Sequence, residues 1–292
     1  MTMQGKHVLI TGGNTGIGKA TATELARRGA SVTITSRSPA RGEAAVAEIR
    51  QGSGSDAVDV MSLDLASLAD VRRFAAEFLA SHSRLDVLVN NAGLILSERS
   101  ETVDGFETTF GVNHLGHFLL TNLLLPRLKQ SAPSRIVVLS SDAHRAAFGL
   151  DFDDLQARRG YQGFRVYARS KLANLLFVVE LAERLRGTGV TANAVHPGFV
   201  RSSFGADGDT GALMTLVLKL GSPFALTVDK GARTSVHVAS APELADTSGE
   251  YFVRSRKTRP SRAAQDRTAA LRLWELSERL TGLAPADAGA AA

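Results

Sequence analysis

One stretch near the start of the chain most constrains its fold. Residues 11–18 read T-G-G-N-T-G-I-G, follow an apolar run at 8–10 and lead into a helical pattern over 19–29. A strand, a glycine-rich turn and a helix N-terminus in this order let backbone amides approach a pyrophosphate. The glycine spacing is G-x-x-x-G-x-G, and an ordinary strand-to-helix connection is the alternative. We predict a dinucleotide site held by Gly12, Asn14, Thr15, Gly16, Ile17 and Gly18.

The rest of the chain repeats the alternation of strand and helix. Apolar, β-branched runs at 30–37, 57–63, 85–89, 134–141, 190–195 and 250–253 alternate with helical patterns at 39–49, 67–81, 102–128, 167–186, 229–240 and 263–280. This pattern predicts an α/β fold of the Rossmann type, with a doubly wound, mainly parallel seven-stranded sheet and helices on both faces.

The pattern favours a single domain over residues 1–282. Glycines mixed with apolar residues over about 199–228 suggest a lid over a site, or else a surface helix packed on the sheet. We expect the Ala-rich tail at 283–292 to be disordered.

Composition excludes several classes of protein. No run of 18 apolar residues occurs, so we expect no membrane span, and the short segment before the first strand predicts no signal peptide. Zero cysteines leave no disulfide or thiolate nucleophile, and the histidines lack metal-ligand spacing, so we expect no metal. A net charge of +5 comes without a nucleic-acid-binding motif. A cytoplasmic protein without a nucleic-acid partner is expected.

The second strand ends in Thr35, Ser36 and Arg37 and offers no carboxylate to a ribose 2′-hydroxyl. A guanidinium suits a 2′-phosphate, so the sequence favours NADP(H) over NAD(H). The alternative is that Arg37 simply faces solvent. Asp64, just past the third strand, either accepts a hydrogen bond from the adenine amino group or caps the following turn.

Other polar residues gather where later strands end. N-N-A-G at 90–93 suits a loop lying against a flat ligand, and the fifth strand delivers Ser140 and Ser141. Tyr167 and Lys171 are four residues apart and therefore project from one face of a helix. Asn113 falls inside a helical pattern, where asparagine is unfavourable and needs a kink, a backbone bond or a water site to explain it.

In this order, these motifs resemble the non-extended branch of the short-chain dehydrogenase/reductase family. The resemblance covers the chain from Lys6 to about Leu280. It implies that Tyr167 is the general acid/base, that Lys171 stabilises its phenolate and holds the nicotinamide ribose, and that Ser141 rather than Ser140 bonds the substrate oxygen. Asn113 would hold a water for proton relay. The implied cofactor contacts include Asp64, Leu65, Asn91, Ala92, Gly93, Pro197, Gly198, Val200 and Ser202.

Within that family, several stretches look like the retinol dehydrogenase-like group. They include F-G-V-N-H-L-G-H-F at 110–118 and V-H-P-G-F-V-R-S at 195–202. The resemblance implies an NAD(P)-dependent oxidoreductase that interconverts an aldehyde or ketone and an alcohol, on a lipophilic substrate and usually with NADPH. Many members carry an N-terminal membrane anchor that is not seen here, which puts membrane-borne substrates in doubt.

Two alternatives to the carbonyl reductase stay open. One is a catalytically silent NADP-sensing or protein-binding relative, which the intact Asn113, Ser141, Tyr167 and Lys171 argue against. The other is a dehydratase or epimerase, which the lack of a large C-terminal substrate domain disfavours. Relatives often form homodimers or homotetramers, and the sequence shows no interface.

Overall fold

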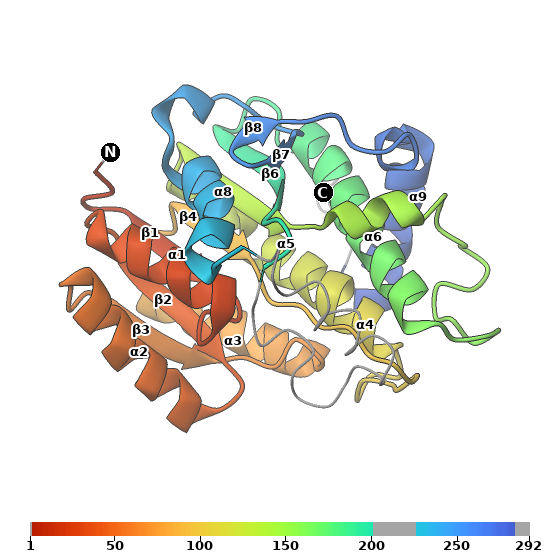
Figure 1. The fold of residues 1–292 in the computed structure, drawn as a ribbon, viewed down its shortest axis with the longest axis horizontal. Helices are drawn as coiled ribbons and strands as arrows, with labels where there is room; N and C mark the ends of the chain where they lie inside the picture. The colour runs from red at the N-terminus through yellow and green to blue at the C-terminus, as the bar shows by residue number, and fades with distance from the viewer. Residues whose placement is uncertain (1, 201–225, 284–292) are drawn as a thin grey trace, which may run out of the picture.

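A central sheet organises the molecule in a computed structural model that describes residues 2–200 and 226–283 (Figure 1). The strand order is β3-β2-β1-β4-β5-β6-β7-β8, and the first seven strands run parallel. The strands are β1 (His7–Ile10), β2 (Ser31–Ser36), β3 (Val58–Ser62), β4 (Val87–Asn90), β5 (Ser134–Leu139), β6 (Val190–His196), β7 (Tyr251–Val253) and β8 (Arg256–Lys257). The predicted doubly wound α/β fold is confirmed.

The eighth strand is the one departure from the predicted count of seven. β8 pairs antiparallel with β7 through a tight turn in which Arg254 and Ser255 have φ of 50° and 59°. Such hairpin turns usually contain glycine or asparagine, so this turn gave no signal in the sequence. A strand of two exposed charged residues also shows no alternation.

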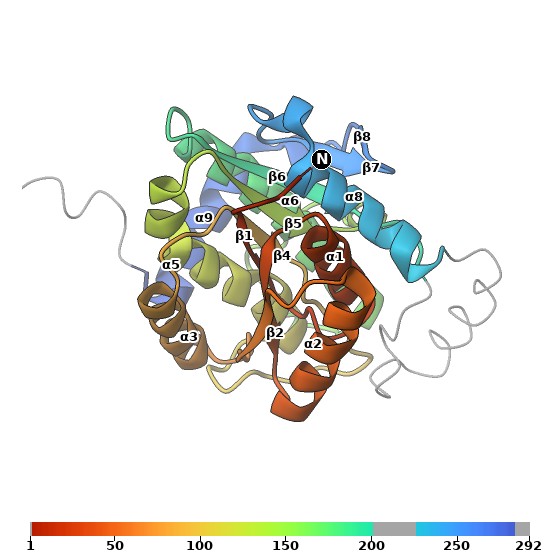
Figure 2. The same cartoon turned by 90° about the vertical axis from the view of Figure 1, so that its left-hand side faces the viewer.

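Helices cover both faces of the sheet. Figure 2 shows α1, α2 and α8 on one side, and α3, α5 and α9 on the other. The helices are α1 (Gly16–Arg27), α2 (Pro39–Ser53), α3 (Leu68–Ser81), α4 (Thr108–Phe110), α5 (Gly116–Gln130), α6 (Gly163–Arg184), α8 (Val228–Ser240) and α9 (Arg267–Thr281). Short 3-10 turns η2 (Asp142–Ala146), η4 (Pro242–Leu244) and η5 (Ala263–Gln265) lie between them. Alternate β1 side chains enter the two apolar cores, Leu9 on one face and Val8 and Ile10 on the other.

The predicted continuous helix over 102–128 is wrong in its first part. The helix begins at Thr108, where the buried Glu107 carboxylate accepts bonds from the amides of Thr109 and Phe110. It then widens into a π-helical stretch, η1 (Gly111–Leu115), before α5. Such π-bulges are frequent at functional sites, and this one carries Asn113.

Two further predictions concern segments that lie mainly outside the described residues. The proposed lid at about 199–228 is described only at its two ends, where residues 200 and 226 form a parallel bridge. Of the tail at 283–292, only Leu283 is described, and its amide bonds the carbonyl of Glu278.

Candidate active site

The glycine-rich turn lies at the C-terminal edge of the sheet, between β1 and α1. The sheet order changes direction between β1 and β4, which is where ligands bind in open α/β sheets. Gly12 and Gly16 have φ of 61° and 52°, and a Cβ on Gly18 would lie 2.5 Å from the Asn91 amide nitrogen. These positions exclude side chains, and the first amides of α1 are open to an anion. The cradle therefore fits a dinucleotide pyrophosphate.

Thr11 organises this cradle, and the prediction of site residues omitted it. Its hydroxyl oxygen accepts the amides of Asn91 and Ala92 at 2.9 and 3.0 Å. The Asn91 side-chain amide in turn donates to the carbonyls of Thr11 at 2.8 Å and Gly12 at 3.2 Å. Asn91 and Ala92 thus lie against the glycine turn. A threonine beside a glycine run has no special pattern, so only the fold shows its role.

His117 is a second residue that sequence reasoning did not place in the site. It is buried on α5, and its Nε2 lies 2.8 Å from the Thr11 hydroxyl. The Asn113 carbonyl lies 3.3 Å from Nδ1 and can only accept, so Nδ1 carries the ring proton. Nε2 then accepts the Thr11 hydroxyl, which also lies 3.4 Å from the Val89 carbonyl oxygen. Burial, joined by the charge of Lys171, lowers the pKa of His117 to about 4. The neutral ring of His117 thus connects the glycine-rich turn to η1.

The two predicted adenosine contacts lie at neighbouring strand ends. Arg37 follows β2 and is exposed, and among the described residues it makes no hydrogen bond or ion pair, so its guanidinium is open to a ligand. Asp64 follows β3 and performs the alternative role: its carboxylate accepts the amide of Ala66 at 3.0 Å. A carboxylate has capacity for further bonds, so this cap does not exclude an adenine contact. Leu65 is buried beside it.

Asn113 makes backbone bonds, which were one of the three explanations considered for an asparagine at this position. Its side chain accepts the Leu94 amide at 2.8 Å and donates to the Leu94 carbonyl at 2.9 Å and to the Ser170 hydroxyl at 3.0 Å. The loop after β4 is therefore joined to η1 and α6. A Cβ on Gly93 would lie 3.3 Å from both the Asn113 oxygen and the Lys171 Nζ, so these groups meet at this glycine.

The two serines after β5 point to different partners. The Ser140 hydroxyl donates to the Lys171 carbonyl at 2.8 Å and holds α6 in place. Ser141 bonds the Tyr167 phenol, which lowers the tyrosine pKa, but burial outweighs that bond and raises the pKa of Tyr167 to about 12. Neighbouring side chains point in opposite directions here, so Ser140 holds α6 while Ser141 reaches the Tyr167 phenol.

Lys171 lies buried below Tyr167 on the same face of α6. Its Nζ donates to the Leu139 carbonyl at 3.2 Å and lies 5.6 Å from the centre of the tyrosine ring. Burial lowers the pKa of Lys171 to about 8. The ammonium is therefore held at the end of β5, and at pH 7 it is still mainly charged.

The last predicted cofactor contacts follow β6. Pro197 and Gly198 come directly after its end, and Gly198 has a φ of 90° that favours glycine. Val200 packs near Gly231 at the start of α8. Ser202 lies outside the described residues.

Across residues 2–200 and 226–283, no group of three or more His, Cys, Asp or Glu side chains is arranged to hold a metal ion. Over the same residues, no helix combines the length and the apolar character that crossing a bilayer requires.

The site thus combines a glycine cradle, an exposed arginine after the end of β2, and a serine–tyrosine–lysine group beside Asn113. The arrangement suits proton transfer at a tyrosine next to a bound dinucleotide. The family model for short chain dehydrogenases matches residues 6–210, and the chain belongs to this family.

Within that family the chain lies with the retinol dehydrogenases. It is 50% identical to retinol dehydrogenase 12 of Mus musculus, covering 96% of this chain and 87% of that protein. It is 48% identical to retinol dehydrogenase 13 of Homo sapiens, covering 97% and 86%. A crystal structure of an uncharacterized protein from Mycobacterium paratuberculosis aligns with a TM-score of 0.77 and 39% identity over 96% of this chain and 95% of the other. The RhlG/NADP active-site complex of Pseudomonas aeruginosa aligns with a TM-score of 0.69 and 26% identity, covering 86% and 95%.

Proposed function

We propose that the chain is an NADP(H)-preferring oxidoreductase that reduces lipophilic aldehydes or ketones and oxidises the corresponding alcohols. The observation that carries the proposal is that Ser141, Tyr167 and Lys171 meet beside the glycine cradle, with Asn113 joining the loops around them. The preference for NADP(H) is supported by Arg37, exposed at the end of β2 where no carboxylate is present. When bound, the nicotinamide supplies or accepts the hydride.

Tyr167 is proposed to move the proton. With its pKa raised to about 12, the phenol is protonated at neutral pH and can give its proton to a carbonyl oxygen as that oxygen gains charge. The Ser141 hydroxyl lies within bonding reach of the same phenol and can donate to the same oxygen. The charge of Lys171, one turn along α6, stabilises the phenolate that remains.

The roles of the cofactor-binding residues are part of the proposal. The amides at the start of α1, next to Thr15, Gly16 and Ile17, would bind the pyrophosphate, and Asn91 to Gly93 would line the nicotinamide side. A lipophilic substrate is supported by the relatives named after retinol, an apolar alcohol. A cytoplasmic location is likewise proposed, and the cysteine-free composition suits a reducing compartment.

The test is a turnover assay of the purified chain with NADPH or NADH and a panel of straight-chain, branched and aromatic aldehydes and ketones. We expect cofactor oxidation with several apolar aldehydes and a higher kcat/KM with NADPH. Tight NADPH binding without turnover of any carbonyl would favour the catalytically silent alternative. Equal kcat/KM with the two cofactors would contradict the NADP(H) preference alone.

A further inference from the structure

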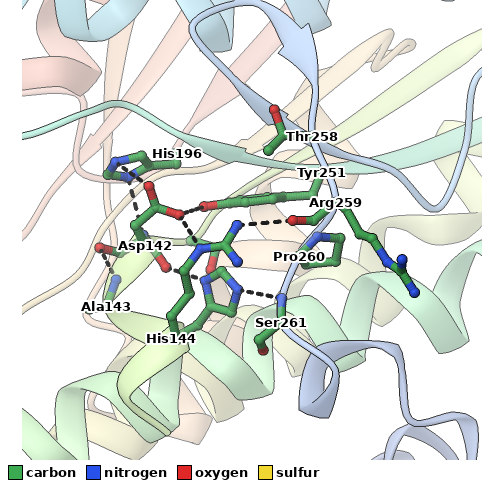
Figure 3. Close-up of polar contacts among 12 residues, drawn as sticks. Asp142, Ala143, His144, His196, Tyr251, Thr258, Arg259, Pro260 and Ser261 are labelled. Carbon is green, nitrogen blue, oxygen red and sulfur yellow. Dashed lines mark hydrogen bonds and ion pairs between the residues drawn. The ribbon is translucent and has the colours of Figure 1, made fainter.

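A buried histidine lies three residues after Ser141, outside the proposed chemistry, and both of its ring nitrogens are engaged (Figure 3). His144 Nδ1 lies 2.6 Å from the Ser141 carbonyl oxygen, and the Ser261 backbone amide donates to Nε2 at 3.1 Å. A backbone amide can only donate, so Nε2 is unprotonated and the single ring proton is on Nδ1. The His144 ring thus connects the serine backbone to a segment more than 100 residues later in the chain.

The contact with Ser141 is reinforced from the backbone. The same carbonyl also accepts the His144 amide at 3.0 Å, and the Ser141 hydroxyl accepts the Ala143 amide at 3.1 Å. The carbonyl of Ser141 therefore has two donors that come from one residue. A rotation of the peptide after Ser141 would break both bonds and displace the Ala143 amide that holds the hydroxyl.

Asp142 holds the same turn from the other side, as Figure 3 shows. Its carboxylate accepts the Tyr251 hydroxyl at 3.2 Å and the Arg145 Nε at 3.0 Å, and its amide donates to His196 Nδ1 at 3.4 Å. Arg145 then donates to the Arg259 carbonyl at 2.9 Å. The turn after Ser141 is fixed to β6, to β7 and to the C-terminal segment, residues 258–261.

We propose that His144 is a positioning residue for Ser141. Its Nδ1 holds the Ser141 carbonyl, and its Nε2 is held by the Ser261 amide. Through these two bonds the C-terminal segment, residues 258–261, sets the direction of the serine hydroxyl. The inference rests on the proposed role of Ser141 in the reaction. The His144 ring is fully buried and meets Tyr251 edge to face, with ring centres 5.3 Å apart, so it has little freedom to leave this position. Burial also lowers the pKa of His144, which keeps the ring in the neutral form that both bonds require.

Two variants separate the two ends of this connection. His144→Asn puts an amide nitrogen where Nδ1 lies and keeps the donor to Ser141, but does not reach Ser261. His144→Gln puts an oxygen where Nε2 lies and keeps the acceptor for Ser261, but gives nothing to the Ser141 carbonyl. The measurements are kcat and KM with NADPH and an aldehyde that the wild type reduces, and amide exchange of the peptide that contains Ser261.

For His144→Gln we expect kcat to fall roughly tenfold or more, because misplacing a group in the site by an ångström is enough for such a loss, with KM for NADPH unchanged. For His144→Asn, which keeps the donor to Ser141 but loses the contact with Ser261, we expect a smaller fall in kcat than for His144→Gln, together with faster exchange at Ser261. Equal kcat in the two variants would overturn the proposal. So would a fall in kcat accompanied by an equal loss of NADPH affinity, since that is the result of general loosening.

Tyr251→Phe gives a second route if either histidine variant fails to fold. It keeps the ring against His144 and removes only the hydroxyl bond to Asp142, so we expect a smaller loss of kcat with KM for NADPH unchanged. Arg259→Ala is the control. It removes the Arg259 side chain but keeps the backbone carbonyl that accepts the Arg145 bond, so its kcat should match the wild type. No effect of Tyr251→Phe together with a large effect of Arg259→Ala would overturn the proposal.

The exchange measurement keeps this inference separate from the proposed function. If the wild type reduces no carbonyl, the proposed function fails and the catalytic part of the inference fails with it. Unchanged exchange at Ser261 in His144→Asn, in an active enzyme, would overturn the contact while leaving the proposed function intact.

Discussion

The proposed preference for NADP(H) rests on Arg37, exposed after the end of β2. Arg37→Ala removes the exposed guanidinium at the end of β2, and a hydrogen bond to a charged group is worth enough for NADPH to bind about tenfold more weakly. NADH has no 2′-phosphate, so its binding should change less than about twofold. Titration of the cofactor against each variant measures both constants.

Arg41→Ala is the matched control, because Arg41 is also exposed and lies in the first turn of α2. Equal weakening of NADPH and NADH in Arg37→Ala would refute the 2′-phosphate contact.

Single residues also show what the sequence could and could not reveal. The four-residue spacing of Tyr167 and Lys171 predicted that they share one face of a helix, and the structure puts them there. Their proposed roles came from the family resemblance and not from the spacing. Thr11 and His117 were missed, because their importance comes from a contact across 106 positions that no local pattern contains. Asp64 was given two roles, and only the described turn shows that the cap is real.

Close packing between elements gives a prediction about Gly116 at the start of α5. A Cβ there would lie 2.6 Å from the Leu65 carbonyl oxygen, so Gly116→Ala forces α5 away from the loop after β3. Overpacking costs about 1–3 kcal/mol and exceeds the gain of about 1 kcal/mol from alanine in a helix, so we expect a net loss of stability of about 1 kcal/mol.

Denaturant unfolding measures this change. Gly149→Ala is the control, since nothing lies within 4 Å of its Cβ, and it should unfold like the wild type. A Gly116→Ala protein as stable as that control would contradict the contact.

The strands and helices were predictable where the apolar period runs long, as in β5 and α6. Prediction failed where the backbone departs from ordinary helix geometry or where a strand is too short to show a pattern. The π-helical stretch η1 reads like ordinary helix, because its residues keep helical spacing and the bonds of Asn113 to Leu94 and Ser170 are not local in sequence. β8 is too short to have a period, and its turn uses neither glycine nor asparagine.

The molecule as a whole should lose stability in mild acid. Burial is the largest cause that lowers the pKa of His7 and His117 to about 4 and of His114 to about 3. Each stays neutral in the fold while the unfolded chain takes up a proton below pH 6.5, so stability is complete above that pH and falls as the pH drops toward 4.

One proton per histidine corresponds to about 1.4 kcal/mol per pH unit, so the three give about 4 kcal/mol per pH unit near pH 5. Unfolding free energies at pH 7, 6 and 5 measure this slope. His114→Gln should reduce it by about one proton, whatever it does to stability at pH 7. An unfolding free energy that does not change between pH 7 and pH 5, or that rises as the pH falls, would contradict the presence of buried neutral histidines.

The proton-donating tyrosine is the centre of the proposal, and replacing it tests the proposal most directly. Tyr167→Phe keeps the ring and removes the hydroxyl, and the loss of a general acid lowers kcat by about 10²–10⁴-fold. Tyr161→Phe is the matched control, since Tyr161 is a second partly buried tyrosine whose hydroxyl bonds Glu107 at 3.2 Å. We expect Tyr167→Phe to bind NADPH like the wild type and to reduce the aldehyde at least about a hundredfold more slowly, with Tyr161→Phe within a few-fold of the wild type. Wild-type turnover by Tyr167→Phe would contradict the proposed mechanism.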